Sequence, residues 1–89
     1  MAGTVADPKA IFQVALKANA SSIILAHNHP SGDCTPSPED LRFTEEVVRA
    51  GKLLDIAVLD HIIISSQDKT SIRRTGKVPF GNTSGKRWD

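Results

Sequence analysis

Apolar side chains recur every three or four residues in two parts of the chain, which is the spacing of an amphipathic helix. The first pattern predicts a helix over about residues 8–19. Asp7 precedes it as a capping carboxylate, and Pro8 takes the first helical position, where its missing N–H costs nothing. The second pattern is broader and predicts a helix over about residues 38–54, with its charged side chains turned outward.

Continuous apolar runs, rather than alternating ones, mark two buried strands. These strands cover residues 22–26 and 57–65, and a weaker strand is expected near residues 70–74. Residues 30–38 are rich in proline, glycine and serine, and this composition predicts an ordered loop before the second helix. The order of the elements indicates a mixed α/β domain of layered (α+β) type, with its chemistry at the ends of the strands.

Length and composition restrict the class of protein. The chain has 89 residues, which is enough for one small domain with a modest core. Cys34 is its single cysteine, so no disulfide can form within the chain, and a reducing, cytoplasmic setting is expected. No apolar run approaches the roughly 18 residues of a membrane helix, so no membrane contact is expected.

The two parts of the chain carry opposite charge. Residues 1–68 hold five basic and nine acidic residues, a net charge of −4, whereas residues 69–89 hold six basic residues and one acidic residue, a net charge of +5. We therefore expect a folded domain over residues 1–75 and a basic, disordered tail over residues 76–89. Such a tail can contact the phosphates of nucleic acid weakly, or it can simply remain solvated.

Two histidines follow the first predicted strand. His27 and His29 are two residues apart, and side chains at this spacing point to the same side of an extended chain. Asp40 lies in the first turn of the second helix and can add a carboxylate. Three protein ligands with one open position are typical of a catalytic zinc ion. A structural site would need a fourth ligand, for which Cys34 is the obvious candidate.

The same residues have simpler interpretations. The two histidines can be surface imidazoles that bond to loop carbonyl groups. Ser37 and Asp40 match a capping box, in which the serine oxygen accepts the Asp40 N–H and the carboxylate reaches back. A carboxylate has two oxygens, so Asp40 can cap the helix and bind a metal at the same time. Taken alone, these residues leave metal binding open.

The residues from His27 to Asp40 also match a longer pattern, which bears on whether they bind a metal. They follow the pattern His-x-His, seven residues, Ser, two residues, Asp, through His27-Asn28-His29-Pro30-Ser31-Gly32, Pro36-Ser37 and Asp40. With this string the chain resembles the RadC-like family of the JAMM (MPN) metalloprotease superfamily. The resemblance extends over about residues 3–65 and implies an MPN fold, in which helices flank a curved mixed sheet.

The resemblance also implies a site. Zinc (Zn²⁺) would be held by His27, His29 and Asp40, and Ser37 would donate to the oxyanion that forms when a peptide or isopeptide bond of a protein substrate is hydrolysed. In the superfamily a glutamate on an earlier strand is the general base, but residues 1–38 contain no glutamate. We therefore expect an N-terminally truncated form of the fold, with impaired hydrolysis.

Further expectations concern the neighbours of this site. At most one of Asp60 and His61 can face the metal, because consecutive strand residues point to opposite sides. Glu39 is expected to be a solvated residue of the first helical turn, and Cys34 a loop residue rather than a ligand. Missing early strands would leave an unpaired sheet edge, so we expect a homodimer through that edge.

An alternative function is a nucleic-acid or protein interaction module associated with DNA repair. In that case the metal site would be structural.

Overall fold

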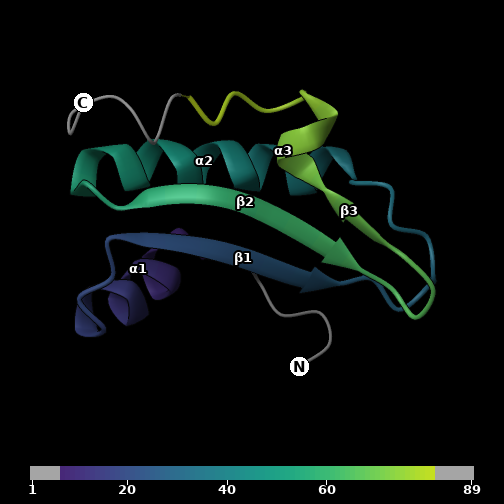
Figure 1. Cartoon of the computed structure of the whole chain (residues 1–89), viewed down its shortest axis with the longest axis horizontal. Coiled ribbons are helices and arrows are strands. Elements are labelled where there is room, and N and C mark those ends of the chain that lie inside the picture. The colour runs from purple at the N-terminus through teal and green to yellow at the C-terminus, as the bar shows by residue number, and fades with distance from the viewer. Residues whose placement is uncertain (1–6, 82–89) are drawn as a thin grey trace.

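The computed structural model describes residues 7–81, in which three helices pack around a three-stranded sheet (Figure 1). The elements are α1 (Pro8–Lys17), β1 (Ser22–Asn28), α2 (Pro38–Leu54), β2 (Ala57–Ile64), β3 (Lys69–Ser71) and α3 (Ile72–Thr75). The two long helices and the positions of the two main strands that the sequence predicts are confirmed. The expected burial holds for β2 but not for β1, which has no buried residue because it is an edge strand of the sheet in the described range. The predicted loop connects β1 to α2.

Local chemistry fixes both ends of α1. The carboxylate of Asp7 accepts the backbone N–H of Lys9 at 2.9 Å, and Pro8 takes the first helical position. The helix ends at Lys17, earlier than expected, and Asn19 then adopts a left-handed conformation with a φ of 54°. Asparagine tolerates this conformation better than most residues, so it can turn the chain toward β1.

The sheet is mixed and has the order β1-β2-β3. β1 runs parallel to β2, whereas β3 pairs antiparallel with β2. Both α2 and α3 pack against β2, and α1 packs against α2. The fold is therefore of the α+β class, with a mixed sheet flanked by helices, as the sequence and the resemblance imply.

Gly51 lies inside α2, although glycine is about 1 kcal/mol less favourable than alanine in a helix. A Cβ atom at this position would lie 2.4 Å from the carbonyl oxygen of Ile56 and 3.0 Å from the side chain of Val58. The Ile56 N–H donates to the Gly51 carbonyl oxygen at 2.8 Å, so the chain passes close over this residue as it enters β2. Glycine is needed here for a close backbone approach.

The two faces of the sheet differ in their covering. Leu25 and His61 are register partners and lie on the face toward α2. Ile24 and Ile64 point to the opposite face, where they are 61 % and 41 % exposed. Within residues 7–81 no strand pairs with the outer edge of β1. This part of the chain therefore presents apolar side chains next to unpaired backbone N–H and C=O groups.

We expect a second copy of the chain to cover this edge, because unpaired strand edges readily pair with other chains. The measurement is the mass in solution by light scattering over a wide range of concentration, which should approach that of a dimer. Ile24→Lys should shift the mass toward the monomer, whereas Leu53→Lys should not, because Leu53 is 85 % exposed at the end of α2. A monomeric wild-type chain at every concentration would contradict the expectation.

The chain after β2 differs from the sequence prediction. The strand expected near residues 70–74 ends at Ser71, and α3 follows at once. The Ser71 hydroxyl oxygen accepts the Arg74 N–H and caps this short helix. Isoleucine is β-branched and therefore favours strands, but Ile72 is buried in the core, and this packing stabilises it in the helix.

Packing also continues beyond residue 75, where the domain was expected to end. Val78 and Phe80 are both 3 % exposed and belong to the core, and the Arg73 guanidinium lies 5.4 Å from the centre of the Phe80 ring. The segment is irregular, but the expected tail does not start at residue 76. Residues 82–89 lie outside the described residues, as do residues 3–6, where the resemblance begins. None of the helices in the described range has the length and apolar character needed to cross a membrane.

Candidate metal centre

The end of β1 and the start of α2 bring three candidate ligands together. His27 lies in β1, and His29 follows the strand with its N–H bonded to the Ile64 carbonyl oxygen at 2.8 Å. Asp40 lies in the first turn of α2 and is 8 % exposed. One ligand atom from each of His27, His29 and Asp40 can be chosen so that all three lie within 4.8 Å of one another. The structure therefore assembles the group that the sequence spacing predicts.

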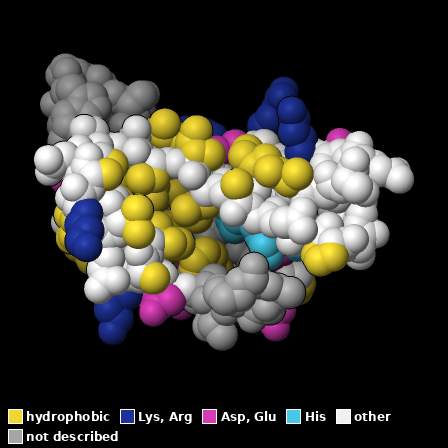
Figure 2. Space-filling model, turned by 90° about the horizontal axis from the view of Figure 1, so that it is seen from below, with side chains coloured by type: hydrophobic (Ala, Val, Ile, Leu, Met, Phe, Trp, Pro, Cys, Tyr) yellow, Lys and Arg dark blue, Asp and Glu magenta, His cyan; other side chains and the backbone are white. Residues whose placement is uncertain are grey.

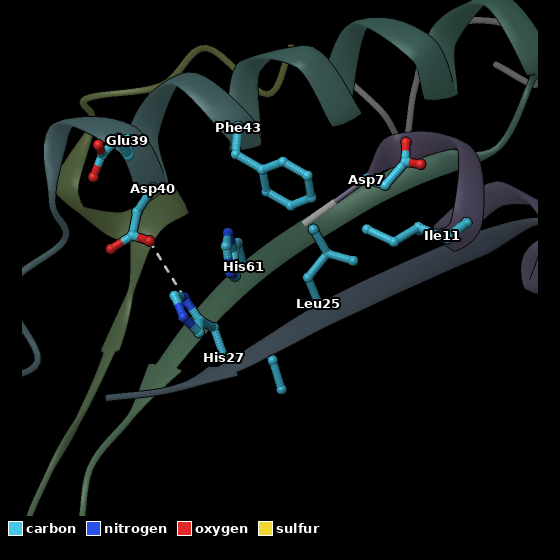
Figure 3. A pocket seen from close by; sticks show the side chains of 10 residues that line it. Asp7, Ile11, Leu25, His27, Glu39, Asp40, Phe43 and His61 are labelled. Atoms are coloured by element: carbon cyan, nitrogen blue, oxygen red, sulfur yellow. Dashed lines mark ion pairs between the residues drawn. The ribbon is translucent and has the colours of Figure 1, made fainter. Parts of the chain in front are cut away.

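The two imidazoles approach different oxygens of one carboxylate. Nδ1 of His27 lies 3.3 Å from Oδ1 of Asp40, the contact drawn as a dashed line in Figure 3. Nε2 of His29 lies 3.1 Å from Oδ2 of Asp40. The side chain of His27 is 43 % exposed and that of His29 only 19 %, so the cluster opens toward solvent on the side of His27.

The hydrogen bond on the far side of His29 determines how this ring meets Asp40. Its Nδ1 lies 2.9 Å from the carbonyl oxygen of Asp33. A carbonyl oxygen only accepts, so Nδ1 carries the proton. In the neutral ring the lone pair of Nε2 then faces the Asp40 carboxylate, an arrangement that requires a positive charge between the two groups or a second proton on the ring. A hydrogen bond of this kind is typical of metal-binding histidines.

Asp40 is held by the capping box that the sequence predicts. Its N–H donates to Oγ of Ser37 at 3.0 Å, and its Oδ2 accepts the Ser37 N–H at 2.8 Å. Burial alone would raise the pKa of Asp40, but the hydrogen bonds from Ser37 and the nearby His27 and His29 outweigh it, so the pKa lies below its ordinary value of 3.8. The group is therefore a carboxylate at neutral pH, as a metal ligand must be.

The donor set fits a zinc ion. Zinc binds nitrogen and carboxylate oxygen at about 2.0–2.1 Å in tetrahedral geometry, which places neighbouring donors about 3.3 Å apart. The two His-to-Asp40 distances, 3.3 and 3.1 Å, are close to this separation, but they involve the two different carboxylate oxygens. With one ligand atom from each residue, the three atoms lie within 4.8 Å of one another, so a tetrahedral site requires the side chains to move closer together. Two imidazoles and one carboxylate also leave one of four positions open.

A cavity of about 620 Å³ adjoins the cluster. His27, Asp40 and His61 line one end, and apolar side chains of α1, β1 and α2, among them Ile11, Leu25 and Phe43, line the other (Figure 3). In the space-filling view, hydrophobic side chains gather on one side of the histidines (Figure 2). The arrangement places an apolar hollow beside a polar cluster, which is typical of binding sites for organic ligands.

Ser37 does not line this cavity. It caps α2 behind Asp40 and is half-buried. Its Oγ accepts the Asp40 N–H, and the hydroxyl proton remains available to donate. The role of Ser37 as an oxyanion donor stays a prediction.

The neighbours of the cluster agree with several sequence expectations. His61 faces the cavity, whereas Asp60 points away from it and bonds the Ser71 hydroxyl and the Arg73 N–H. Cys34 is a buried loop residue that lies outside the candidate group of His27, His29 and Asp40. Glu39 is exposed, as expected, but it also lies at the rim of the cavity, with its carboxylate turned away from His27 (Figure 3).

Thr44 is a residue that the sequence analysis missed. It is fully buried, one helical turn after Asp40, and its hydroxyl lies 2.7 Å from the Asp40 carbonyl oxygen and 2.6 Å from Nδ1 of His61. Burial lowers the pKa of His61, as does His27, against the opposing effect of Asp40 and Asp60. The signal in the sequence is a polar residue on the buried stripe of a helix, four positions after a candidate ligand.

Comparison with known proteins identifies the same family that the sequence motif resembles. Residues 1–77 match the family described as the RadC-like JAB domain. The UPF0758 protein of Chloroflexus aggregans is 52 % identical over 66 residues, which is 74 % of this chain and 29 % of the relative. The UPF0758 protein of Thermosynechococcus vestitus is 49 % identical over 85 residues, which is 91 % of this chain and 34 % of the relative. The chain thus spans about a third of the length of the curated relatives that it matches.

Proposed function

Because the chain belongs to the RadC-like JAB domain family, we propose that His27, His29 and Asp40 hold a zinc ion and that the completed site hydrolyses peptide or isopeptide bonds. The observation that supports this proposal most directly is the convergence of the three donors at one end of the cavity. A polar cluster with an open ligand position can then act on a substrate that the cavity binds.

The chain's own residues would bind and orient the substrate. Zinc, when bound, supplies a Lewis acid that polarises a carbonyl group and acidifies water. The apolar end of the cavity, at Ile11, Leu25 and Phe43, would bind an apolar side chain and exclude water from it. The Ser37 hydroxyl proton, which the capping bond leaves available, would stabilise the oxyanion.

The general base of the superfamily has no counterpart among the described residues. Residues 1–38 contain no glutamate. Within residues 7–81, the carboxylates at the cavity besides Asp40 are Asp7, which caps α1, and Glu39, which turns away from the histidines. We therefore propose a slow site rather than an efficient enzyme. Nucleic-acid contact of the basic C-terminal residues, a link to DNA repair and a cytoplasmic location remain predictions from the sequence.

The test is hydrolysis of fluorogenic peptide and isopeptide substrates by the chain with added zinc. We expect weak turnover that a chelator removes and that zinc restores. Asp40→Asn should abolish it while leaving the helix cap, because an amide oxygen can still accept the Ser37 N–H. Asp68→Asn is the matched control, since Asp68 lies in the β2–β3 turn, outside the metal-binding group. Turnover that persists in the chelated chain or in Asp40→Asn would contradict the proposal.

A further inference from the structure

A buried pair of side chains stands directly behind the candidate ligands. Thr44 is fully buried and His61 is 3 % exposed. Thr44 belongs to α2 and His61 to β2, so their contact joins the helix that carries Asp40 to the strand beside the one that carries His27. Neither residue belongs to the group that could hold the ion in the described structure.

Counting protons gives the direction of the hydrogen bonds. The Thr44 hydroxyl has one proton, and the Asp40 carbonyl oxygen, 2.7 Å away, can only accept it. The Thr44 oxygen must therefore accept from His61, whose Nδ1 lies 2.6 Å away. The result is a directed chain in which His61 Nδ1–H donates to the Thr44 hydroxyl oxygen and the Thr44 hydroxyl donates to the backbone carbonyl oxygen of Asp40. The reverse direction would leave two acceptor oxygens facing each other without a proton.

The ring of His61 also supports His27. The two imidazoles are stacked, with centroids 5.9 Å apart and an interplanar angle of 25°. Phe43 packs edge-on against the His61 ring, with centroids 6.3 Å apart. His27 is the most exposed of the candidate ligands. The His61 ring stacked against one side of it therefore limits the orientations that the His27 ring can adopt.

From these contacts we propose that Thr44 and His61 are positioning residues, which hold Asp40 and His27 in the arrangement that binds the metal. The inference rests on the proposed function, because it concerns the same site. His61 acts on Asp40 through Thr44 and on His27 by direct stacking. Groups that orient metal ligands typically change metal affinity about 10- to 100-fold when they are removed.

Paired variants at Thr44 separate hydrogen bonding from packing. Thr44→Val keeps the shape and removes the hydroxyl, whereas Thr44→Ser keeps the hydroxyl and removes a methyl group. With zinc affinity measured by competition with a chelating dye, we expect Thr44→Val to bind about 10- to 100-fold more weakly and Thr44→Ser to stay close to wild type. A role in packing alone predicts the opposite order, because serine leaves a cavity where valine leaves none.

A second pair of variants tests His61, and its result does not depend on whether the Thr44 variants fold. His61→Asn retains an N–H donor near the position of Nδ1, and His61→Leu does not. Asparagine should therefore preserve more of the zinc affinity than leucine. Cobalt absorption spectra of the same proteins should show altered ligand geometry in His61→Leu and Thr44→Val.

Asp60→Asn is the matched control, because Asp60 is the strand neighbour of His61 and its side chain bonds Ser71 and Arg73 on the other side of β2. Its Oδ1 also accepts the His61 backbone N–H, and the amide oxygen of asparagine can still accept it. It should lower stability without changing zinc affinity. In the metal-free chain, imidazole ¹⁵N shifts should show the proton of His61 on Nδ1. The inference is overturned if folded Thr44→Val and His61→Leu bind zinc like wild type, or if the proton lies on Nε2. Failure of wild type to bind zinc would instead remove the proposed function.

Discussion

Close to one zinc ion should bind per wild-type chain, and His29→Ala should abolish this binding. His29 is the most constrained imidazole of the cluster, because its Nδ1–H is bonded to the Asp33 carbonyl oxygen and its Nε2 is directed at Asp40. Two remaining ligands cannot provide the three protein contacts that a catalytic zinc site requires. Metal analysis of the purified proteins, followed by calorimetric titration of zinc into the metal-free forms, measures both stoichiometry and affinity.

Further variants show whether the loss comes from the ligand or from the fold. His27→Ala should also abolish binding, and Asp40→Asn should weaken it strongly while the α2 cap remains. Asp68→Asn should bind zinc like wild type, since Asp68 lies outside the group. Circular dichroism of each protein checks that it is folded. The claim that these residues bind zinc would be wrong if the wild-type chain contained no zinc after exposure to the metal. It would also be wrong if both histidine variants bound zinc as tightly as wild type.

Adding the upstream part of a longer relative should raise zinc-dependent hydrolysis about 10²- to 10⁴-fold, which is the usual contribution of a positioned general base. The reason is the absence of glutamate before residue 39 in this chain, together with relatives about three times as long. The fusion would join the N-terminal part of such a relative to this chain, and turnover of the same fluorogenic substrates would be compared with that of the chain alone.

Two controls make this comparison specific. Replacing the candidate glutamate of the added part with glutamine should remove the gain, because the amide cannot accept the proton. The fusion with Asp40→Asn should be inactive in spite of the added glutamate. Fast zinc-dependent hydrolysis by the chain alone would show that the inference from the missing carboxylate is wrong.

The candidate ligands could be predicted from the sequence because their arrangement follows from local rules. His27 and His29 share a face through the two-residue period of a strand, and Asp40 has a fixed place in the first turn of a helix that begins at a recognisable cap. The contact between Thr44 and His61 follows no such rule. It joins a helix to a strand 17 positions away, so it depends on how α2 is rotated over the sheet.

The last described residues show a second limit of prediction from sequence. Val78 and Phe80 are separated by Pro79 in an irregular segment, where no period of 2 or 3.6 can indicate burial. The turn into α3 has the same character, because Ser71 can continue a strand or cap a helix. Its hydrogen bond to the Arg74 N–H decides for the helix.

The loop between β1 and α2 has a consequence for the unfolded chain. A cation held by His27 and Asp40 would close a loop of 14 residues, the interval between them counted inclusively. A covalent cross-link around a loop of about this length stabilises a protein by about 3 kcal/mol, because it restricts the denatured ensemble. With Cys34 as its single cysteine, the chain can form no disulfide of its own. A metal that stays bound during partial unfolding would take the place of that cross-link, and its removal would then increase the entropy gained on unfolding.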